Sequence, residues 1–365
     1  MQKLRVGLVG AGLVGQAEHA FYLWDDRDRF EFAALADASP SVRAAVGARY
    51  GVPALYATLG EMLVARLDAV VIAAPDPFHP ELAVAALDAG LHVLCEKPLA
   101  LTVAGCNAIA AARDRSGCIV QVAYMKRHDP AYRRALALLP ERIEDVRLIA
   151  VEVNDPDQDP FVAHLPMVSP ADLPAPLRAE ADRKAQLQLD EAAERKLNDR
   201  EARALANGFF SAMVHDVAVV HGILARLGCE LPAEAGDGRI FDNGRGVHLS
   251  FPLPGDGRAA LTHLNLPGVP DYTERITVYC TDRIIELTFP SPYLRHFPTR
   301  LTVRRGAPGH TLELIDERVS FEEAFREQLR AFHAAVLGVR PVETPLEQAR
   351  RDIELLTSAF HRAIT

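Results

Sequence analysis

The chain has 365 residues, a length that suggests two domains rather than one. Hydrophobic residues make up 49% and charged residues 24%, so the chain can bury a core and is not a disordered protein. The net charge of −9 at pH 7 comes without a basic stripe, which excludes nucleic-acid binding through phosphate neutralisation as an expected function.

Cysteine usage and the N-terminus bear on the cellular compartment. The cysteines are irregularly spaced and include no C-x-x-C pair, which favours reduced thiols over a disulfide framework or a zinc site, so no metal is expected. No signal-peptide pattern precedes the apolar run that begins at Leu4. No apolar run reaches the roughly 18–20 residues of a membrane helix. We therefore expect a soluble, cytoplasmic protein. The five cysteines are Cys95, Cys106, Cys118, Cys229 and Cys280.

Over the first third of the chain, short apolar runs alternate with Ala-rich helical patterns. Helices are predicted at 81–89 and 103–115. Alternation of strands and helices is the pattern of a doubly wound parallel sheet. We expect this first domain to end near residue 124. Its predicted strands are 4–9, 30–36, 69–73, 92–95 and 118–122.

Beyond residue 140 the pattern changes. A strand at 146–153 is followed by a Pro-rich stretch, polar helices within 177–206 and a far more apolar helix at 209–227. Short turns between the later strands predict antiparallel pairing. We therefore expect an α/β chain whose second domain, 125–365, contains an insertion at 156–206 on the substrate side. The later strands are predicted at 247–251, 259–264, 274–280, 283–287 and 300–303, and the closing helices at 321–337 and 344–363.

A G-x-G-x-x-G motif follows the first strand and opens a helix, and Asp37 closes the second strand. Such glycines let the backbone approach a pyrophosphate, and the carboxylate accepts hydrogen bonds from the adenosine ribose. The alternative is an ordinary glycine turn with a surface aspartate. Asp37 would repel a 2′-phosphate, so NAD is favoured over NADP, and Arg43 is the nearest cation that could favour NADP. The cofactor-binding residues predicted here are Gly10, Ala11, Gly12, Leu13, Val14, Gly15 and Asp37.

Two further strand ends point to the same crevice, because ligands bind at the carboxyl edge of such a sheet. The third strand is followed by Ala74, Pro75 and His79, although His79 could also be a helix-start residue without a chemical role. The fourth strand ends in Glu96-Lys97-Pro98. A lysine at this place can take part in proton chemistry. The alternative for this tripeptide is a surface pair of Glu96 and Lys97.

Together with Tyr124-Met125-Lys126-Arg127 and Asp129-Pro130, these motifs resemble the Gfo/Idh/MocA family of glucose–fructose oxidoreductases and inositol dehydrogenases. The motifs cover residues 1–135 in the family's order, and residues 321–365 are similar to its closing helices. The resemblance implies a Rossmann domain that binds NAD(P), followed by an α/β domain with an open, mostly antiparallel sheet that forms a dimer interface. It implies that the final helix packs back toward the Rossmann domain. It also implies a catalytic Lys97 and a cis Lys97–Pro98 peptide.

The resemblance further implies a catalytic Asp and a His four residues later on a helix of the second domain. His215 matches that histidine, but Ser211 stands in the Asp position, and Ala218 stands at a second commonly acidic position. The i, i+4 spacing places Ser211 and His215 on one helix face. A neutral His suits the base that accepts a hydroxyl proton, with Lys97 assisting, whereas Ser211 can hydrogen-bond without supplying charge. The alternative is that His215 is a core histidine.

The expected activity is NAD-dependent interconversion of a secondary alcohol and a ketone on a cyclic polyol, inositol or sugar derivative. The alternatives are an NAD-assisted glycoside hydrolase or lyase and a non-catalytic nicotinamide-binding protein. Partners are expected to be the small-molecule substrate and further copies of the chain, as a homodimer or homotetramer through the C-terminal sheet. Lys126 and Arg127 could instead cap a helix on its solvent side. The predicted substrate-binding residues are Tyr124, Lys126, Arg127, Asn154, Asp155 and His215.

Overall fold

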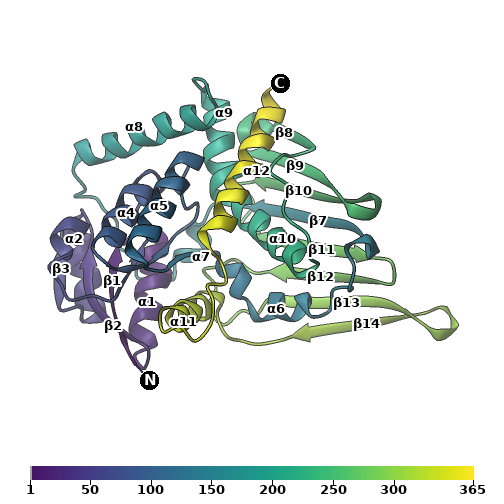
Figure 1. Cartoon of the computed structure of the whole chain (residues 1–365), viewed down its shortest axis with the longest axis horizontal. Coiled ribbons are helices and arrows are strands. Elements are labelled where there is room, and N and C mark those ends of the chain that lie inside the picture. Colours follow the sequence, from purple (N-terminus) through teal and green to yellow (C-terminus); the bar gives the residue numbers. More distant parts are fainter. Residues whose placement is uncertain (1) are drawn as a thin grey trace. The chain divides into compact units, whose positions relative to one another are not determined.

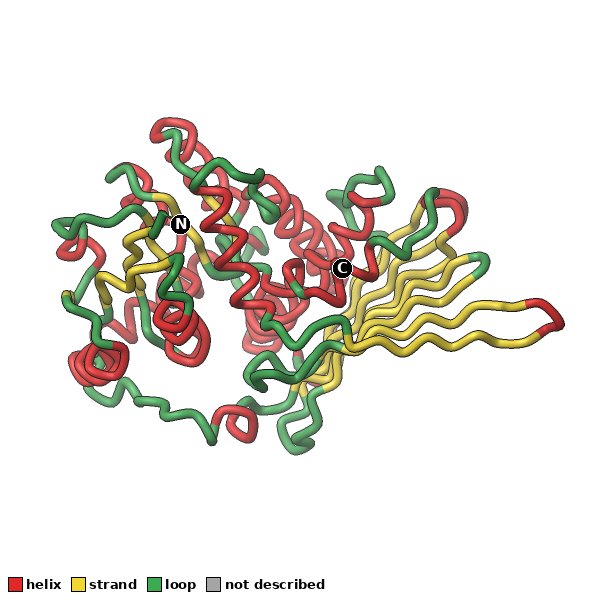
Figure 2. The backbone as a smooth tube through the Cα atoms, turned by 90° about the horizontal axis from the view of Figure 1, so that it is seen from below, coloured by secondary structure: helices red, strands yellow, loops and turns green. Residues whose placement is uncertain are grey.

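The computed structural model describes residues 2–365, which divide into two compact units. The first unit holds the chain as far as residue 124 together with 162–192 and 325–350, and the second holds 125–161, 193–324 and 351–365. The residues expected to form one C-terminal domain are therefore shared between the units. Each unit is built on its own sheet, and the strands of both are yellow in Figure 2.

The sheet of the first unit has six parallel strands in the order β3-β2-β1-β4-β5-β6. This is the doubly wound order with its crossover between β1 and β4. The apolar strands are buried on both faces, as parallel strands covered by helices are; all four residues of β4 are buried. The strands are β1 (Leu4–Val9), β2 (Phe30–Ala36), β3 (Ala54–Tyr56), β4 (Ala69–Ile72), β5 (His92–Cys95) and β6 (Val120–Val122).

Helix capping fixes where the helices of this unit begin and end. Ser39 caps α2 by accepting from the Val42 N–H, and Gly51 ends the same helix in the left-handed conformation. Thr102 caps α5 in the same way, by accepting from the Gly105 N–H. The helices are α1 (Ala20–Asp25), α2 (Pro40–Tyr50), α3 (Leu59–Met62), α4 (His79–Asp88), α5 (Val103–Ser116), α8 (Ala175–Ala192) and α11 (Ala324–Val336) (Figure 1).

The sheet of the second unit has eight strands in the order β14-β13-β12-β11-β7-β10-β9-β8. It is mostly antiparallel, as expected; β7 and β10 form a parallel pair. β8 and β14 lie at the two edges and were not expected from the sequence. The strands are β7 (Val146–Asp155), β8 (Asp237–Phe241), β9 (Gly246–Leu253), β10 (Gly257–Asn265), β11 (Thr273–Cys280), β12 (Arg283–Phe289), β13 (Arg300–Ala307) and β14 (Thr311–Arg318).

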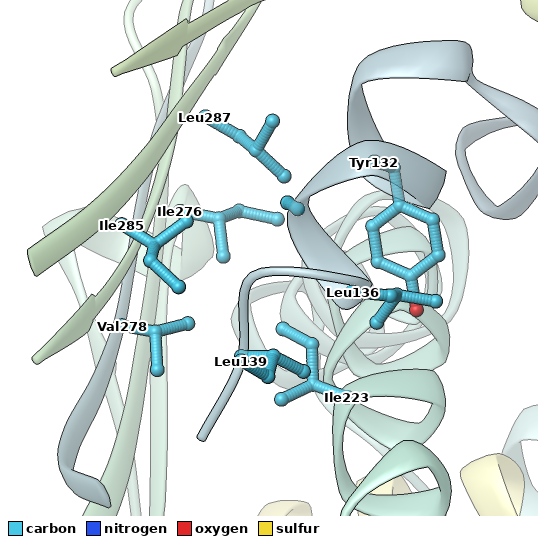
Figure 3. A pocket seen from close by; sticks show the side chains of 9 residues that line it. Tyr132, Leu136, Leu139, Ile223, Ile276, Val278, Ile285 and Leu287 are labelled. Carbon is cyan, nitrogen blue, oxygen red and sulfur yellow. The ribbon is translucent and has the colours of Figure 1, made fainter. Parts of the chain in front are cut away.

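One face of this sheet packs on helices, and the apolar contact includes a small cavity (Figure 3). Side chains of α6 and α10 face those of β11 and β12 across it. The cavity holds about 10 Å³, near the lower limit for one water, and its lining is apolar except for Tyr132, whose hydroxyl already donates to the Val219 carbonyl. It is a packing defect rather than a ligand site. The helices of this unit are α6 (Pro130–Leu136), α7 (Asp159–Val162), α9 (Asp199–Arg203), α10 (Val214–Arg226) and most of α12 (Leu346–Ile364).

A continuous helical segment, residues 199–226, joins α9 to α10 through the π-helical turn η5 (Ala204–Met213). Contrary to the expectation from the sequence, this segment is long and apolar enough to cross a membrane. However, 78% of its most apolar window is buried inside the protein. Such burial is typical of a core helix. In the same unit, His221 of α10 binds Asp352 of α12 at 2.7 Å.

Candidate functional site

The glycine loop, residues 10–15, lies between the carboxyl end of β1 and the π-helical turn η1 (Gly15–His19). Gly10 has φ +88°, and a Cβ there would lie 2.6 Å from the Ala73 carbonyl oxygen. A Cβ on Gly15 would lie 2.5 Å from the Gly10 carbonyl oxygen. A Cβ on Gly12, in contrast, would meet no atom within 4 Å. The first and third glycines are therefore required by close packing, and the second leaves the open backbone that a pyrophosphate needs.

Asp37 lies beside this loop. Its carboxylate accepts hydrogen bonds from the Ala11 N–H at 2.7 Å and the Ser39 N–H at 2.8 Å. Arg43, the cation considered for NADP, donates to the Asp37 backbone carbonyl. The predicted ribose acceptor and the predicted pyrophosphate loop are thus in direct contact.

His79 joins two loops at the carboxyl edge of the sheet. Its Nε2 lies 2.9 Å from the Ala74 carbonyl oxygen and its Nδ1 lies 2.8 Å from the Pro98 carbonyl oxygen. Two carbonyl acceptors need two N–H donors, which only the imidazolium form supplies. Burial alone lowers the pKa of His79, but interactions with Cys95 and Asp76 raise it to about 10. His79 is therefore a positioning residue that holds the Ala74 loop against the Lys97–Pro98 segment.

The Lys97–Pro98 peptide is cis, which the family resemblance implied. Glu96 is buried and binds His19 at 2.7 Å, so Glu96 and Lys97 do not form a surface ion pair. Burial raises the pKa of Glu96, but the His19 hydrogen bond and the Lys97 charge outweigh it and hold that pKa below its usual value. Lys97 itself is half-buried and directly follows β5, with its N–H donating to the Glu96 carboxylate at 3.1 Å.

In the second unit, a buried cluster surrounds Lys126, which the sequence singled out. Lys126 Nζ lies 2.5 Å from Glu274 Oε2 and 3.9 Å from Asp216 Oδ1. The Tyr272 hydroxyl donates to the same oxygen of Glu274. Burial lowers the pKa of Lys126, but Glu274, Asp216 and Asp155 raise it above its usual value, in that order. We call Lys126, Asp216, Tyr272 and Glu274 the buried charge cluster.

Asp216 is the carboxyl group of this cluster whose ionisation is disfavoured. Burial raises the pKa of Asp216 well above its usual value; Lys126 opposes this shift and Glu274 adds to it. Neither Asp216 Oδ1 nor Glu274 Oε1 receives a hydrogen bond. Both carboxyl groups are buried and lie within 4 Å of the same Lys126 ammonium, so the charge of one disfavours ionisation of the other. The environment of Asp216, one residue from His215 in the chain, therefore favours the protonated form of this carboxyl group.

We expect the pH dependence of stability to change in Asp216→Asn. Because the pKa of Asp216 is raised from 3.8, the folded protein binds a proton that the unfolded chain has lost, so this group's contribution to the free energy of unfolding falls as pH rises from about 4. Asparagine cannot titrate, so the variant should gain stability relative to wild type in urea titrations as pH rises from about 4 to neutral pH. The exposed Asp157→Asn is the control. A stability difference that is constant over this range would contradict the assignment.

The other predicted substrate residues lie in different settings. Arg127 donates to the Ala218 carbonyl of α10 at 3.1 Å, and Asn154 donates to the Asp271 carbonyl at 2.7 Å. Asp155 binds Gln158 at 2.6 Å and acts on Lys126 through its charge. Tyr124 is buried at the end of the first unit. Of these residues, the structure brings Lys126 and Asp155 to the charge cluster and turns Arg127 toward the backbone of α10.

Ser211 and His215 lie on the long helical segment, both half-exposed. Ser211 is in η5 and His215 in the first turn of α10. A π-helical turn of this kind is common at functional sites. Sequence reasoning missed Glu274 and Tyr272. The sequence does contain a clue to Glu274, because this charged residue alternates with the apolar Ile276 and Val278 on the buried face of β11.

Residues 4–124 match the Gfo/Idh/MocA oxidoreductase family, described as having an NAD-binding Rossmann fold. An inositol 2-dehydrogenase of Saccharopolyspora erythraea is 41% identical over 139 residues, which cover 36% of this chain and 41% of the relative. A D-apiose dehydrogenase of Paraburkholderia graminis is 35% identical over 132 residues, covering 36% of this chain and 35% of the relative. The chain thus aligns with about two fifths of the length of these relatives or less.

Solved structures resemble the whole chain in fold. Scyllo-inositol dehydrogenase of Lactobacillus casei, solved with NAD(H) and scyllo-inositol, has a TM-score of 0.69 at 18% identity and covers 100% of this chain and 97% of that one. UDP-N-acetylglucosamine 3-dehydrogenase of Acidithiobacillus ferrooxidans has a TM-score of 0.72 at 18% identity, covering 100% and 98%. At this identity the likeness concerns the fold alone. Residues 4–124 of the chain therefore match the family model of the Gfo/Idh/MocA oxidoreductases, with its NAD-binding Rossmann fold, and the rest of the chain resembles the solved structures in fold.

Proposed function

We propose that the protein is an NAD-dependent dehydrogenase that interconverts a secondary alcohol and a ketone on a cyclic polyol, inositol or sugar derivative. The observation that carries this proposal is the contact of Asp37 with the glycine loop, which sets a ribose acceptor beside an open pyrophosphate cradle. The inositol 2-dehydrogenases that match the same domain support the substrate class.

The residues present fit a nicotinamide dinucleotide. The open backbone at Gly12 and the N-terminus of the following helix would hold the pyrophosphate, and Asp37 would hold the adenosine ribose. Ala74 and Pro75, tied to Pro98 through His79, would support the nicotinamide side. When bound, NAD accepts the hydride that leaves the alcohol carbon.

The chain's own residues then accept the proton of the substrate hydroxyl and stabilise the alkoxide charge. We assign to His215 the acceptance of the substrate hydroxyl proton and to Lys97 the stabilisation of the developing alkoxide. Ser211 can donate a hydrogen bond to a substrate hydroxyl. Lys126 and Asp155 offer donor and acceptor groups for further hydroxyls.

The proposal is tested by adding NAD and a panel of inositols, sugars and sugar acids to the purified protein and following absorbance of reduced nicotinamide. A dehydrogenase reduces NAD in proportion to substrate consumed. Release of an aglycone from a glycoside without net NADH would replace the proposal by redox-assisted glycoside cleavage. NAD binding with neither reaction across the panel would favour a non-catalytic nicotinamide-binding protein.

Cofactor preference for NAD over NADP is expected from Asp37. Asp37→Ser removes the carboxylate that accepts hydrogen bonds from the Ala11 and Ser39 N–H groups, so NAD should bind about tenfold more weakly. The same change removes the charge that would repel a 2′-phosphate, so the difference between the NAD and NADP affinities should become smaller. Calorimetric titration with both dinucleotides measures this. Asp68→Ser is the matched control. Asp68 directly precedes β4, at the amino ends of the strands and away from the glycine loop, and its carboxylate accepts from the Arg5 N–H. Tighter binding of NADP than NAD by the unaltered protein would refute the preference.

We also propose a cytoplasmic enzyme that assembles as a homodimer or homotetramer through the β7–β14 sheet. Light scattering coupled to gel filtration measures the assembly. A monomer at micromolar concentration would exclude it.

A further inference from the structure

Part of the predicted insertion belongs to the dinucleotide-binding unit and contacts it beside Asp37. Residues 162–192 cluster with this unit. We call residues 168–172 the strap. Figure 1 shows the chain leaving the N-terminal end of α8 toward α2. Arg178 of α8 donates to the Pro170 carbonyl of the strap at 2.8 Å.

Asp172 of the strap occupies the N-terminus of α2. Its Oδ2 accepts from the Ser41 N–H at 2.8 Å, and its Oδ1 accepts from the Ser41 hydroxyl at 2.8 Å and from the Ser39 hydroxyl. These hydrogen bonds, with Ser39 the largest, hold the pKa of Asp172 below its usual value, so the group is an anion at neutral pH. Two hydroxyls and a backbone N–H in the first turn of a helix form the kind of donor set that phosphate oxygens use.

The same serines adjoin the proposed ribose acceptor. Ser39 donates its N–H to Asp37 and its hydroxyl to Asp172, so the two carboxylates share one residue. A 2′-phosphate carries about −1.5 to −2 charges at neutral pH. Placed on a ribose held by Asp37, it would need the serine donors that Asp172 already occupies. The nearby cation Arg43 donates to the Asp37 carbonyl.

The strap is fastened at a second point. Gln16, in the turn that follows the glycine loop, accepts from the Val168 N–H at 2.9 Å and donates to the Val168 carbonyl at 3.0 Å. The same side-chain amide donates to the Ala11 carbonyl at 2.8 Å. The strap is therefore hydrogen-bonded both to η1, which follows the glycine loop, and to α2. Two further contacts of α8 with this unit, Gln188 with the Pro77 carbonyl at 2.9 Å and Lys184 with Glu81, hold the segment in place.

We infer that Asp172 is a specificity-determining residue that excludes NADP by occupying the donor set of Ser39 and Ser41 with a fixed negative charge. This inference rests on the proposed binding of NAD. It adds to Asp37 a second carboxylate, supplied by a segment about 135 residues away in the chain. Asp37 accepts hydrogen bonds from the ribose hydroxyls, and Asp172 occupies the Ser39 and Ser41 donors that a 2′-phosphate would otherwise bind.

The test is calorimetric binding of NAD and NADP to wild type, Asp172→Ala and Asp172→Asn, without any substrate. Both variants should bind NADP about tenfold or more tightly than wild type does, because a like-charge contact is removed, while NAD affinity changes little. Asp182→Ala, which removes an exposed carboxylate of α8, is the matched control and should leave both affinities as in wild type.

An unchanged ratio of NADP to NAD affinity in both variants, with wild type still binding NAD, would overturn the role of Asp172 and leave the proposed function standing. Failure of wild type to bind NAD would overturn the proposed function and this inference together. Thermal melting of each variant checks that the strap substitution leaves the fold intact. An equal gain in NADP affinity in Asp182→Ala would show a general charge effect and would also overturn the inference.

Discussion

Replacing Lys97 or His215 by alanine is expected to lower the turnover number by about 10²-fold or more, the usual contribution of a positioned acid or base. Lys97 follows β5 beside the buried Glu96–His19 pair, and His215 lies in the first turn of α10. Neither substitution removes a contact of the glycine loop or of Asp37, so the NAD dissociation constant should stay near its wild-type value. Turnover on the identified substrate and calorimetric NAD binding measure the two effects separately.

Matched variants separate this chemistry from general loss of structure. Lys196→Ala removes an exposed lysine, and His248→Ala removes a half-buried histidine that binds Thr262 at 2.9 Å on the second sheet. Both should keep turnover close to wild type. Near-normal rates in Lys97→Ala and His215→Ala would refute the assignment. A parallel loss of NAD binding would instead assign Lys97 to cofactor retention.

Glu274→Ala is expected to destabilise the protein by about 3–5 kcal/mol, because it leaves the buried ammonium of Lys126 without its nearest partner. Glu274 is fully buried, and its Oε2 accepts from both Lys126 and Tyr272. Asp216 is a weaker partner, because its Oδ1 lies 3.9 Å from Lys126 Nζ. Urea unfolding at neutral pH measures the change in the free energy of unfolding.

The matched control for this prediction is Glu286→Ala on the neighbouring strand β12. Glu286 binds Arg304 at 2.5 Å, but both side chains are partly exposed, so the loss should be about 1 kcal/mol or less. The double variant Lys126→Met with Glu274→Ala should recover much of the stability, because no unpaired charge then remains. A double variant no more stable than Glu274→Ala would show that the cluster stabilises the fold through packing rather than charge.

The strands of the first unit follow directly from local pattern. Predicted strands 4–9, 30–36 and 92–95 coincide with β1, β2 and β5, since these strands are buried on both faces and are nearly continuous apolar runs. The short β3 was missed because only three residues pair, and the edge strands β8 and β14 because they are largely polar. An edge strand has one hydrogen-bonded neighbour and little apolar surface to mark it.

The glycine loop, Asp37 and Lys97 could be singled out from the sequence because each belongs to a motif of fixed short spacing or to the end of a predictable strand, whereas His215 was singled out by the family resemblance. Local chain geometry is enough to give such residues their surroundings. It also accounts for the open backbone at Gly12 and the close packing at Gly10 and Gly15. These features follow from steric limits on neighbouring residues.

Only the tertiary structure decided the partners of Lys126 and the place of the 162–192 segment. Glu274 meets Lys126 because the β11 register turns it inward, and Asp172 meets Ser39 because the chain returns to α2 after an entire strand of the other unit. Both contacts join residues more than 130 positions apart. Charge pairing at such separation depends on burial and on strand register, which the packing of the whole unit sets and no local pattern encodes.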